Sequence, residues 1–176
     1  MQPSFLSLLS GIRHRELSFA SQEMVFDMDA EVSSLFVVKS GLVHLVRFQE
    51  DGGMVVLQRA HAGGVLAEAS VLSDSYHCAA MAIQPSVLKA YPRKSVQTLL
   101  ESSPDAALVY ARFLAAEMRT ARKRAEILAL KTVAERLTAW LTWNHGCLPV
   151  RGTWHHVADE IGVSKEALYR ELSKRR

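Results

Sequence analysis

The segment Thr153–Lys174 constrains the fold of this chain most strongly, because it predicts two short helices joined by a tight turn. Apolar residues recur at helical spacing in both halves, as Val157, Ala158 and Ile161 and then as Leu168 and Leu172. Gly162 lies between the halves, where a left-handed backbone costs least. Ser164 is placed to cap the second helix, and Glu166 puts a negative charge in its first turn. The pattern is that of a helix-turn-helix.

The outward face of the second predicted helix suits the major groove of DNA. Its side chains are cationic or form hydrogen bonds, as contacts with base edges require. The candidate DNA-binding residues are Lys165, Glu166, Tyr169, Arg170 and Lys174. The alternative is an ordinary helical hairpin with a solvated basic face.

Charge is distributed unevenly along the chain. Residues 1–103 hold 8 Lys and Arg against 10 Asp and Glu, whereas residues 104–176 hold 13 against 8. The excess of cations therefore falls in the half with the predicted helix-turn-helix, as expected of a nucleic-acid-binding end joined to a more neutral sensing or scaffold end. A basic surface that is merely solvated would have the same charge, so this asymmetry supports the motif without establishing it.

Composition excludes several classes of protein. A hydrophobic fraction of 49% with 22% charged residues predicts a globular core and excludes disorder. No run approaches the roughly 18 uncharged apolar residues of a membrane span, and the opening MQPSFLSLLSGIRHR lacks the basic start of a secretory signal. The two cysteines, Cys78 and Cys147, form no CxxC or four-ligand set. We therefore expect a cytoplasmic protein with no metal site and no membrane partner.

The region from about Glu23 to Tyr91 predicts short strands separated by turns. Its apolar, branched runs are Leu35–Lys39, Leu42–Phe48, Met54–Leu57, Val65–Leu72 and Ser86–Tyr91. The four residues Glu50–Gly53 predict a hairpin turn between the second and third of these runs. Many short strands at nearly regular spacing are typical of a sandwich or a roll-like barrel.

Helical patterns follow from Arg93 onward. Ser95–Ser102 predicts a short helix, and a longer one runs from Pro104 to about Ala129 without any glycine or further proline. Val133–Trp143 predicts another helix, which Asn144 and Gly146 end.

The long predicted helix has the apolar spacing of a coiled-coil seam. Apolar residues recur at alternating spacings of 4 and 3, at Ala107, Ala111, Leu114, Met118, Ala121, Ala125 and Leu128. We take Leu114, Met118, Ala121, Ala125 and Leu128 as candidate dimer-interface residues. Packing against the chain's own β-rich part is the competing explanation, and the off-seam residues Phe113, Ile127 and Leu130 suit that role.

A β-roll, a long helix and a C-terminal helix-turn-helix, in that order, resemble the cyclic-AMP receptor and fumarate/nitrate regulator (Crp/Fnr) family. The matching segments are LFVVKSGLVHLVR at 35–47, DGGMVVLQRAHAGGVLAEASVL at 51–72, VAERL at 133–137 and HVADEIGVSKEALYREL at 156–172. The resemblance implies an α+β fold with a cyclic-nucleotide-binding-type β-roll sensor domain over 1–103, a dimerisation helix over 104–130 and a DNA-binding domain over 131–176. It also implies that Lys165, Glu166 and Arg170 touch base edges.

The effector region departs from the pattern of family members that bind cyclic AMP. Those members place a glutamate on the ribose and an Arg–Ser pair on the phosphate. Glu68 matches the glutamate after Ala67, but the Arg–Ser position holds Tyr76-His77, or His77-Cys78 after a shift of one residue. The adenine-reading pair is replaced by Ala121-Arg122. The candidate effector-binding residues are Glu68, Tyr76, His77 and Arg122. Because a neutral histidine replaces a bidentate guanidinium poorly, we do not expect cyclic AMP to bind.

Other cofactors of the family lack their ligands here. The oxygen sensor's cysteine cluster is absent, and Ala67 and Ala69 stand near the positions where the carbon-monoxide sensor ligates haem. We expect no haem and assign no other cofactor. His77 and Cys78 are interpreted as structural, with a metal or redox role as the alternative. The sequence ends at Arg176, before the segment that forms the β-hairpin wing of family members.

The sequence thus predicts a homodimeric, DNA-binding transcription regulator whose β-roll responds to an effector. The partners implied are double-stranded DNA, a second copy of the chain, a small-molecule effector and RNA polymerase. The alternative is a dimeric interaction or sensor protein that does not bind DNA. We expect no enzyme and assign no catalytic residue, because His145, His155 and His156 form no HExxH motif and no serine lies in a nucleophile elbow.

Overall fold

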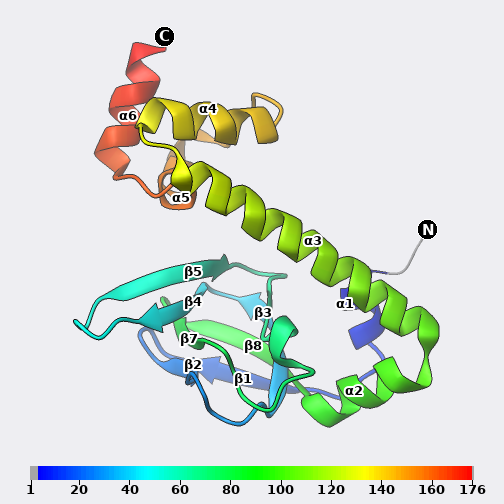
Figure 1. Ribbon diagram of the computed structural model, residues 1–176. Coiled ribbons are helices and arrows are strands. Elements are labelled where there is room, and N and C mark those ends of the chain that lie inside the picture. The colour runs from blue at the N-terminus through cyan, green and yellow to red at the C-terminus, as the bar shows by residue number, and fades with distance from the viewer. Residues whose placement is uncertain (1–3, 176) are drawn as a thin grey trace. The chain divides into compact units, whose positions relative to one another are not determined.

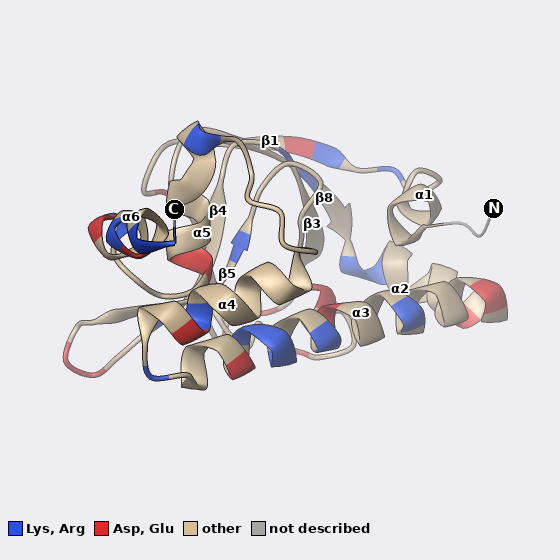
Figure 2. Ribbon diagram, turned by 90° about the horizontal axis from the view of Figure 1, so that it is seen from above, with Lys and Arg blue, Asp and Glu red and all other residues tan. Residues whose placement is uncertain are grey.

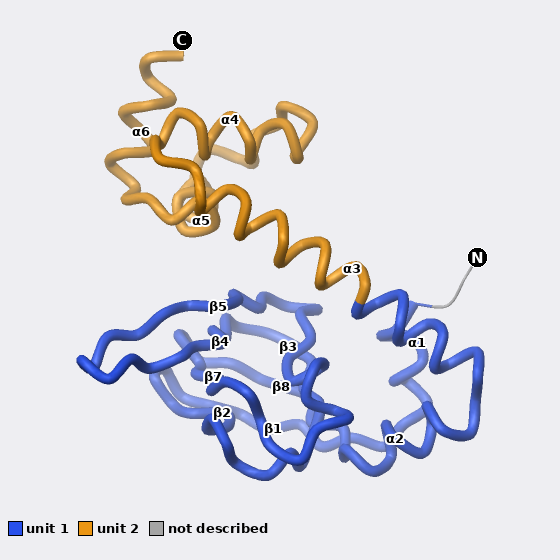
Figure 3. The backbone as a smooth tube through the Cα atoms, viewed as in Figure 1, with its two compact units in different colours: residues 1–114 blue, residues 115–176 orange. Residues whose placement is uncertain are grey.

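The computed structural model describes residues 4–175 (Figure 1). The chain divides into two compact units, Met1–Leu114 and Ala115–Arg176, and the boundary falls inside one long helix (Figure 3). The α-helices are α1 (Phe5–Leu9), α2 (Arg93–Ser102), α3 (Pro104–Ala129), α4 (Val133–Trp143), α5 (Trp154–Glu160) and α6 (Lys165–Lys174). Two short 3-10 helices are η1 (Glu68–Ser70) and η2 (Arg151–Thr153). The structure therefore mixes α and β elements.

The first unit contains two four-stranded antiparallel sheets. Its strands are β1 (Arg15–Phe19), β2 (Met24–Phe26), β3 (Ser34–Ser40), β4 (Val43–Phe48), β5 (Met54–Ala60), β6 (Val65–Leu66), β7 (Ala79–Ala82) and β8 (Ser86–Pro92). One sheet has the order β1-β8-β3-β6 and the other β2-β7-β4-β5. The predicted β-rich architecture of this part is confirmed.

The predicted hairpin turn lies between β4 and β5. The amide of Gln49 donates to the carbonyl of Gly53 at 2.7 Å, and Gly52 has a φ of 83°. That left-handed conformation is the reason for glycine at this position. Of the apolar run Val65–Leu72, only the first two residues form a strand, and the chain then turns through η1.

Two clusters of buried side chains hold the first unit together. Phe36, Leu45, Ala80 and Leu88 belong to the cluster formed by residues of both sheets. The second cluster joins α1, α2 and the beginning of α3 to β3, and Phe113 packs against it. The beginning of α3, as far as Leu114, is thus an integral part of this unit.

The second unit is helical. A capping box at Thr132 and Glu135 begins α4, and Ser164 caps α6 by accepting from the amide of Ala167 at 3.2 Å. Gly162, with a φ of 65°, lies between α5 and α6 as the sequence predicts. A Cβ at Gly162 would come within 2.7 Å of Leu128, so this turn also needs glycine for space. The buried side chains of this unit are Ile127, Leu137, Trp140, Trp154, Val157, Ala158, Ile161, Leu168 and Leu172.

Within residues 4–175, no helix combines the length and the apolar character that crossing a membrane requires. The same residues contain no group of three or more His, Cys, Asp or Glu side chains arranged to hold a metal ion.

Candidate functional site

The candidate effector region of the first unit is built around η1. Ala67, the residue before Glu68, has a left-handed backbone with a φ of 65° and a ψ of 18°. This conformation favours glycine and costs an alanine about 1 kcal/mol. The hydroxyl of Tyr110 on α3 donates to the carbonyl of Glu68 at 2.6 Å and so ties η1 to that helix. The Glu68 side chain, half-buried, is held at the point where η1 begins.

His77 lies beside η1. Its Nδ1 is 2.9 Å from the hydroxyl of Ser70, and its backbone carbonyl accepts from the guanidinium of Arg47 at 2.8 Å. Arg47 lies near the end of β4. It reaches His77 because β4 pairs with β7 through Val46 and Ala79. Arg47, Ser70 and Tyr110 were not evident as candidates from the sequence, because only the strand pairing and the packing of α3 bring them here.

Two side chains near η1, Cys78 and Tyr110, have raised pKa values. Burial, and then the carboxylate of Glu68, raise the pKa of the Cys78 thiol, whereas Arg47 lowers it. The same two causes raise the pKa of Tyr110 to about 12. Cys78 is therefore a protonated, buried thiol at neutral pH, and Glu68 acts electrostatically on both Cys78 and Tyr110.

The other two candidate effector residues lie elsewhere. Tyr76 is 2% exposed and stacks on Phe26 at a ring separation of 4.0 Å. Its hydroxyl accepts from the amides of Ser33 and Ser34 and donates to the carbonyl of Ser34, at 3.0 to 3.2 Å. Tyr76 is thus engaged in the core of the first unit. Arg122 is an exposed residue of α3 in the second unit.

The second candidate surface is the outward face of α6. Leu168 and Leu172 are buried, whereas Lys165, Glu166, Arg170 and Lys174 are exposed and Tyr169 is 39% exposed. Figure 2 colours the Lys and Arg positions of this helix blue and its acidic positions red. The amide at the start of α6 and the Ser164 hydroxyl lower the pKa of Glu166, which is therefore ionised at neutral pH. One helix thus brings together all five candidate DNA-binding residues.

A single arginine joins the α5–α6 turn to the end of α3. Arg136 on α4 donates to the carbonyls of Leu128 and Leu130 at 3.1 and 2.9 Å. It also donates to the carbonyls of Ile161 and Gly162 at 3.2 and 3.0 Å. These carbonyls lie at the C-terminal ends of α3 and α5, where a cation is also favoured by the helix dipole. Arg136 falls within the VAERL segment, but its partners were not evident from the sequence.

The candidate dimer residues lie along α3 and differ in exposure. Met118 and Leu128 are each 48% exposed, and Ala121 and Ala125 are also exposed. Leu114 is half-buried because it packs against the second cluster of the first unit. Of the three off-seam residues, Phe113 packs in that cluster and Ile127 is buried in the second unit. The helix therefore leaves an apolar stripe uncovered from Met118 to Leu128.

Comparison with known proteins gives one family match and several similar structures. Residues 16–103 match the cyclic nucleotide-binding domain family. Over 100 residues, which are 56% of this chain, the sequence is 29% identical to the lysophospholipase nte1 of Neurospora crassa. The chain spans about 7% of the length of that protein.

Solved structures share the fold. FixK2 from Bradyrhizobium japonicum superposes with a TM-score of 0.74 at 22% identity, over 93% of this chain and 84% of that chain. The catabolite activator protein of Thermus thermophilus gives a TM-score of 0.56 at 24% identity, over 95% and 79%. A transcriptional regulator of the CRP family, also from Thermus thermophilus, gives 0.60 at 20% identity, over 90% and 83%. The architecture is thus shared over nearly the whole length of this chain.

Proposed function

Because this chain belongs to the cyclic nucleotide-binding domain family, we propose that it is a transcription regulator of the Crp/Fnr type. Residues 1–103 would form the sensor domain, residues 104–130 the dimerisation helix and residues 131–176 a helix-turn-helix domain. The similar structures, which include a transcriptional regulator of the CRP family, support this assignment. An enzyme is not proposed, since the lysophospholipase match covers only a small part of that protein.

The observation that carries the proposal is the exposed face of α6. A helix that buries only Leu168 and Leu172 presents cationic and hydrogen-bonding side chains on its other side. Lys165 and Arg170 can donate to guanine O6 and N7, and the ionised Glu166 can accept from cytosine N4. Phosphate contacts alone would not require this mixture of donors and an acceptor.

The proposed regulator is a homodimer. Two α3 helices would pair along the stripe from Met118 to Leu128 and present two α6 helices to half-sites about one DNA turn apart. An effector in the β-roll would bias the populations of the dimer's conformations. The region around Glu68, His77 and Arg47 is the proposed effector site, and RNA polymerase is the further proposed partner.

Replacing Arg170 by alanine tests base reading. We expect the affinity for a cognate site to fall by about 1–3 kcal/mol and the preference at one base pair to relax. Selection of binding sites from random DNA with the wild-type chain and with Arg170→Ala measures both effects. Arg119→Ala, which removes an exposed arginine of α3, is the matched control and should keep the wild-type preference.

Two outcomes would contradict that expectation. If Arg170→Ala weakens all sequences equally and lowers the salt dependence, Arg170 contacts phosphate rather than a base. If the wild-type chain enriches no two-fold-related motif, the protein is better described as an interaction or sensor protein that does not read DNA.

Cyclic AMP is expected not to bind. Within residues 4–175, Arg47 is the one arginine that forms a hydrogen bond with His77. Its Nη2 donates to the His77 carbonyl. That bond holds Arg47 against the backbone of His77, and the Arg–Ser position that serves the phosphate in cyclic-AMP binders holds no arginine. Isothermal titration with cyclic AMP up to about 1 mM should show no binding heat. That limit is chosen because a dissociation constant above it corresponds to a binding free energy weaker than about −4 kcal/mol, which is too weak for an effector. Micromolar binding would refute the prediction, and Arg47→Met would then show whether Arg47 holds the phosphate.

A further inference from the structure

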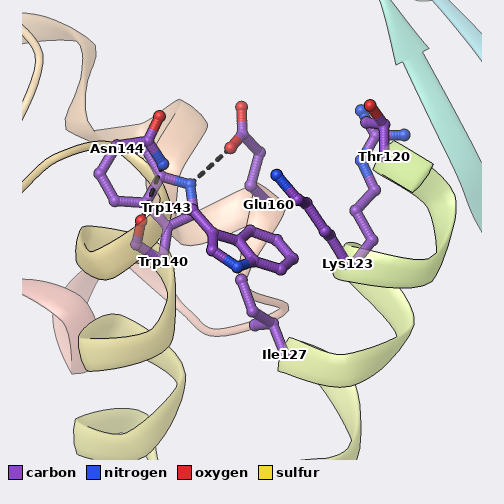
Figure 4. A pocket seen from close by; sticks show the side chains of 8 residues that line it. Thr120, Lys123, Ile127, Trp140, Trp143, Asn144 and Glu160 are labelled. Atoms are coloured by element: carbon purple, nitrogen blue, oxygen red, sulfur yellow. Dashed lines mark hydrogen bonds between the residues drawn. The ribbon is translucent and has the colours of Figure 1, made fainter. Parts of the chain in front are cut away.

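A cavity of about 270 Å³ that is open to solvent lies in the second unit, between α3, α4 and α5 (Figure 4). It is lined by Thr120, Lys123, Arg124 and Ile127 of α3, by Trp140 and Trp143 of α4, and by Asn144 and Glu160. All of these residues belong to one compact unit, whereas the proposed effector region lies in the other. None of the DNA-binding candidates on α6 lines it.

The cavity carries an excess of positive charge. Its one carboxylate, Glu160, accepts from Nε1 of Trp140 at 2.6 Å, so one of its oxygens is already engaged. Lys123 and Arg124 form no salt bridge with any carboxylate in the part of the chain that the structure describes. Glu160 keeps its negative charge, but the two cations outnumber it, so the lining is complementary to an anion held on the side of Lys123 and Arg124.

One wall of the cavity is an aromatic face that a flexible side chain covers. Nζ of Lys123 lies 5.0 Å from the centroid of the Trp143 ring, and Figure 4 shows this lysine extending from α3 toward the indoles of α4. A cation at an exposed site binds a ring weakly, and the lysine stem rotates readily. When the ammonium turns aside, the indole offers a flat apolar surface beside two cations, and planar rings stack on such a surface.

We propose that this cavity binds a small planar aromatic anion, with one or two rings and a carboxylate or phosphate group. The ring would stack on Trp143, and Lys123 and Arg124 would hold the anionic group. The volume limits the size, because pockets for drug-sized ligands occupy roughly 300–1,000 Å³ and this one holds about 270 Å³. The inference does not depend on DNA binding or on the effector region of the first unit.

The three tryptophans of the chain allow a direct test on the full-length protein. Trp140 and Trp143 line the cavity, whereas Trp154 does not, and its Nε1 donates to the carbonyl of Pro149 at 2.9 Å. In ¹H–¹⁵N spectra, benzoate, indole-3-carboxylate and phenyl phosphate should shift the indole signals of Trp140 and Trp143 saturably and leave Trp154 in place. Benzamide lacks the charge and acetate lacks the ring, so each should bind at least about tenfold more weakly than these probes. The phosphate and carboxylate probes together show which anionic group is preferred.

Substitutions then separate this site from non-specific binding. Lys123→Met and Trp143→Leu should each weaken indole-3-carboxylate binding about tenfold, since each removes one of the two recognition elements. Lys131→Met, at an exposed lysine outside the cavity, should leave the affinity unchanged. Lys123 is itself exposed, so its replacement keeps the fold, which the unchanged Trp154 signal would verify. Equal shifts with acetate and indole-3-carboxylate, or unaltered affinity in Lys123→Met, would overturn the proposal.

Discussion

Met118→Glu is expected to convert the proposed dimer into a folded monomer. In a two-fold pair of α3 helices, the two glutamates would face each other in the apolar stripe, and an unpaired carboxylate buried there costs on the order of several kcal/mol. In the single chain, Met118 is 48% exposed, so the same glutamate remains solvated and the fold is retained. Sedimentation velocity should therefore show a dimer for the wild-type protein and a monomer for the variant, with unchanged circular dichroism.

The neighbouring position Thr120 provides the matched control for this experiment. Thr120 is also exposed on α3, but it lies two residues from Met118 and therefore on the opposite side of the helix. Thr120→Glu introduces the same charge and should leave the dimer intact. A variant Met118→Glu that still sediments as a dimer would show that α3 does not pair along this stripe, and Leu128→Glu would then serve to confirm that result.

The helices were predictable from the sequence because their signals are local. Pro104 begins α3, a long interval without glycine maintains it, and Ser164 caps α6 at the residue expected. The stripe of α3 was also visible as a spacing of apolar residues. That spacing did not show that Leu114 packs into the first unit, because heptad periodicity identifies a face of a helix but not what covers it.

The strands were predicted less completely. β1, Arg15–Phe19, lies before the region where strands were expected, and β7 has the sequence AAMA, in which alanine favours strand weakly. The order of strands within each sheet was not predictable either, because an alternating pattern identifies a strand but not its neighbours. Ala67 shows a related effect, since its left-handed backbone ends β6 at a residue type that gives no sign of a turn.

Of the two candidate sites, one could be assembled from the sequence and the other could not. The face of α6 lies on one helix, so helical periodicity was enough to assemble its five residues. The effector region depends on contacts between distant segments: Arg47 reaches His77 over 30 residues of sequence, and Tyr110 reaches Glu68 over 42. Tyr76 lies next to His77 in the sequence, yet it is buried in the core at 2% exposure whereas His77 is exposed, and neither the spacing nor the residue types showed this difference.

Arg136→Met is expected to destabilise the second unit by about 2–4 kcal/mol, since hydrogen bonds from a charged donor contribute roughly 1.5–3 kcal/mol each and are not additive. The guanidinium of Arg136 donates to four carbonyls, two at the end of α3 and two at the end of α5. Methionine keeps much of the stem but leaves all four carbonyls without this donor. Lysine, with one ammonium, should restore only part of the loss, because it does not span both helix ends.

All three tryptophans, Trp140, Trp143 and Trp154, belong to the second unit, so their fluorescence during urea unfolding reports on this unit specifically. Arg136→Met should lower the midpoint of that transition with an unchanged slope, whereas the exposed-site control Arg119→Met should not. A midpoint equal to that of Arg119→Met would mean that water satisfies the four carbonyls equally well. A lowered midpoint would identify Arg136 as a residue that fixes the α5–α6 turn, and with it the proposed DNA-binding face of α6, to the end of the long helix.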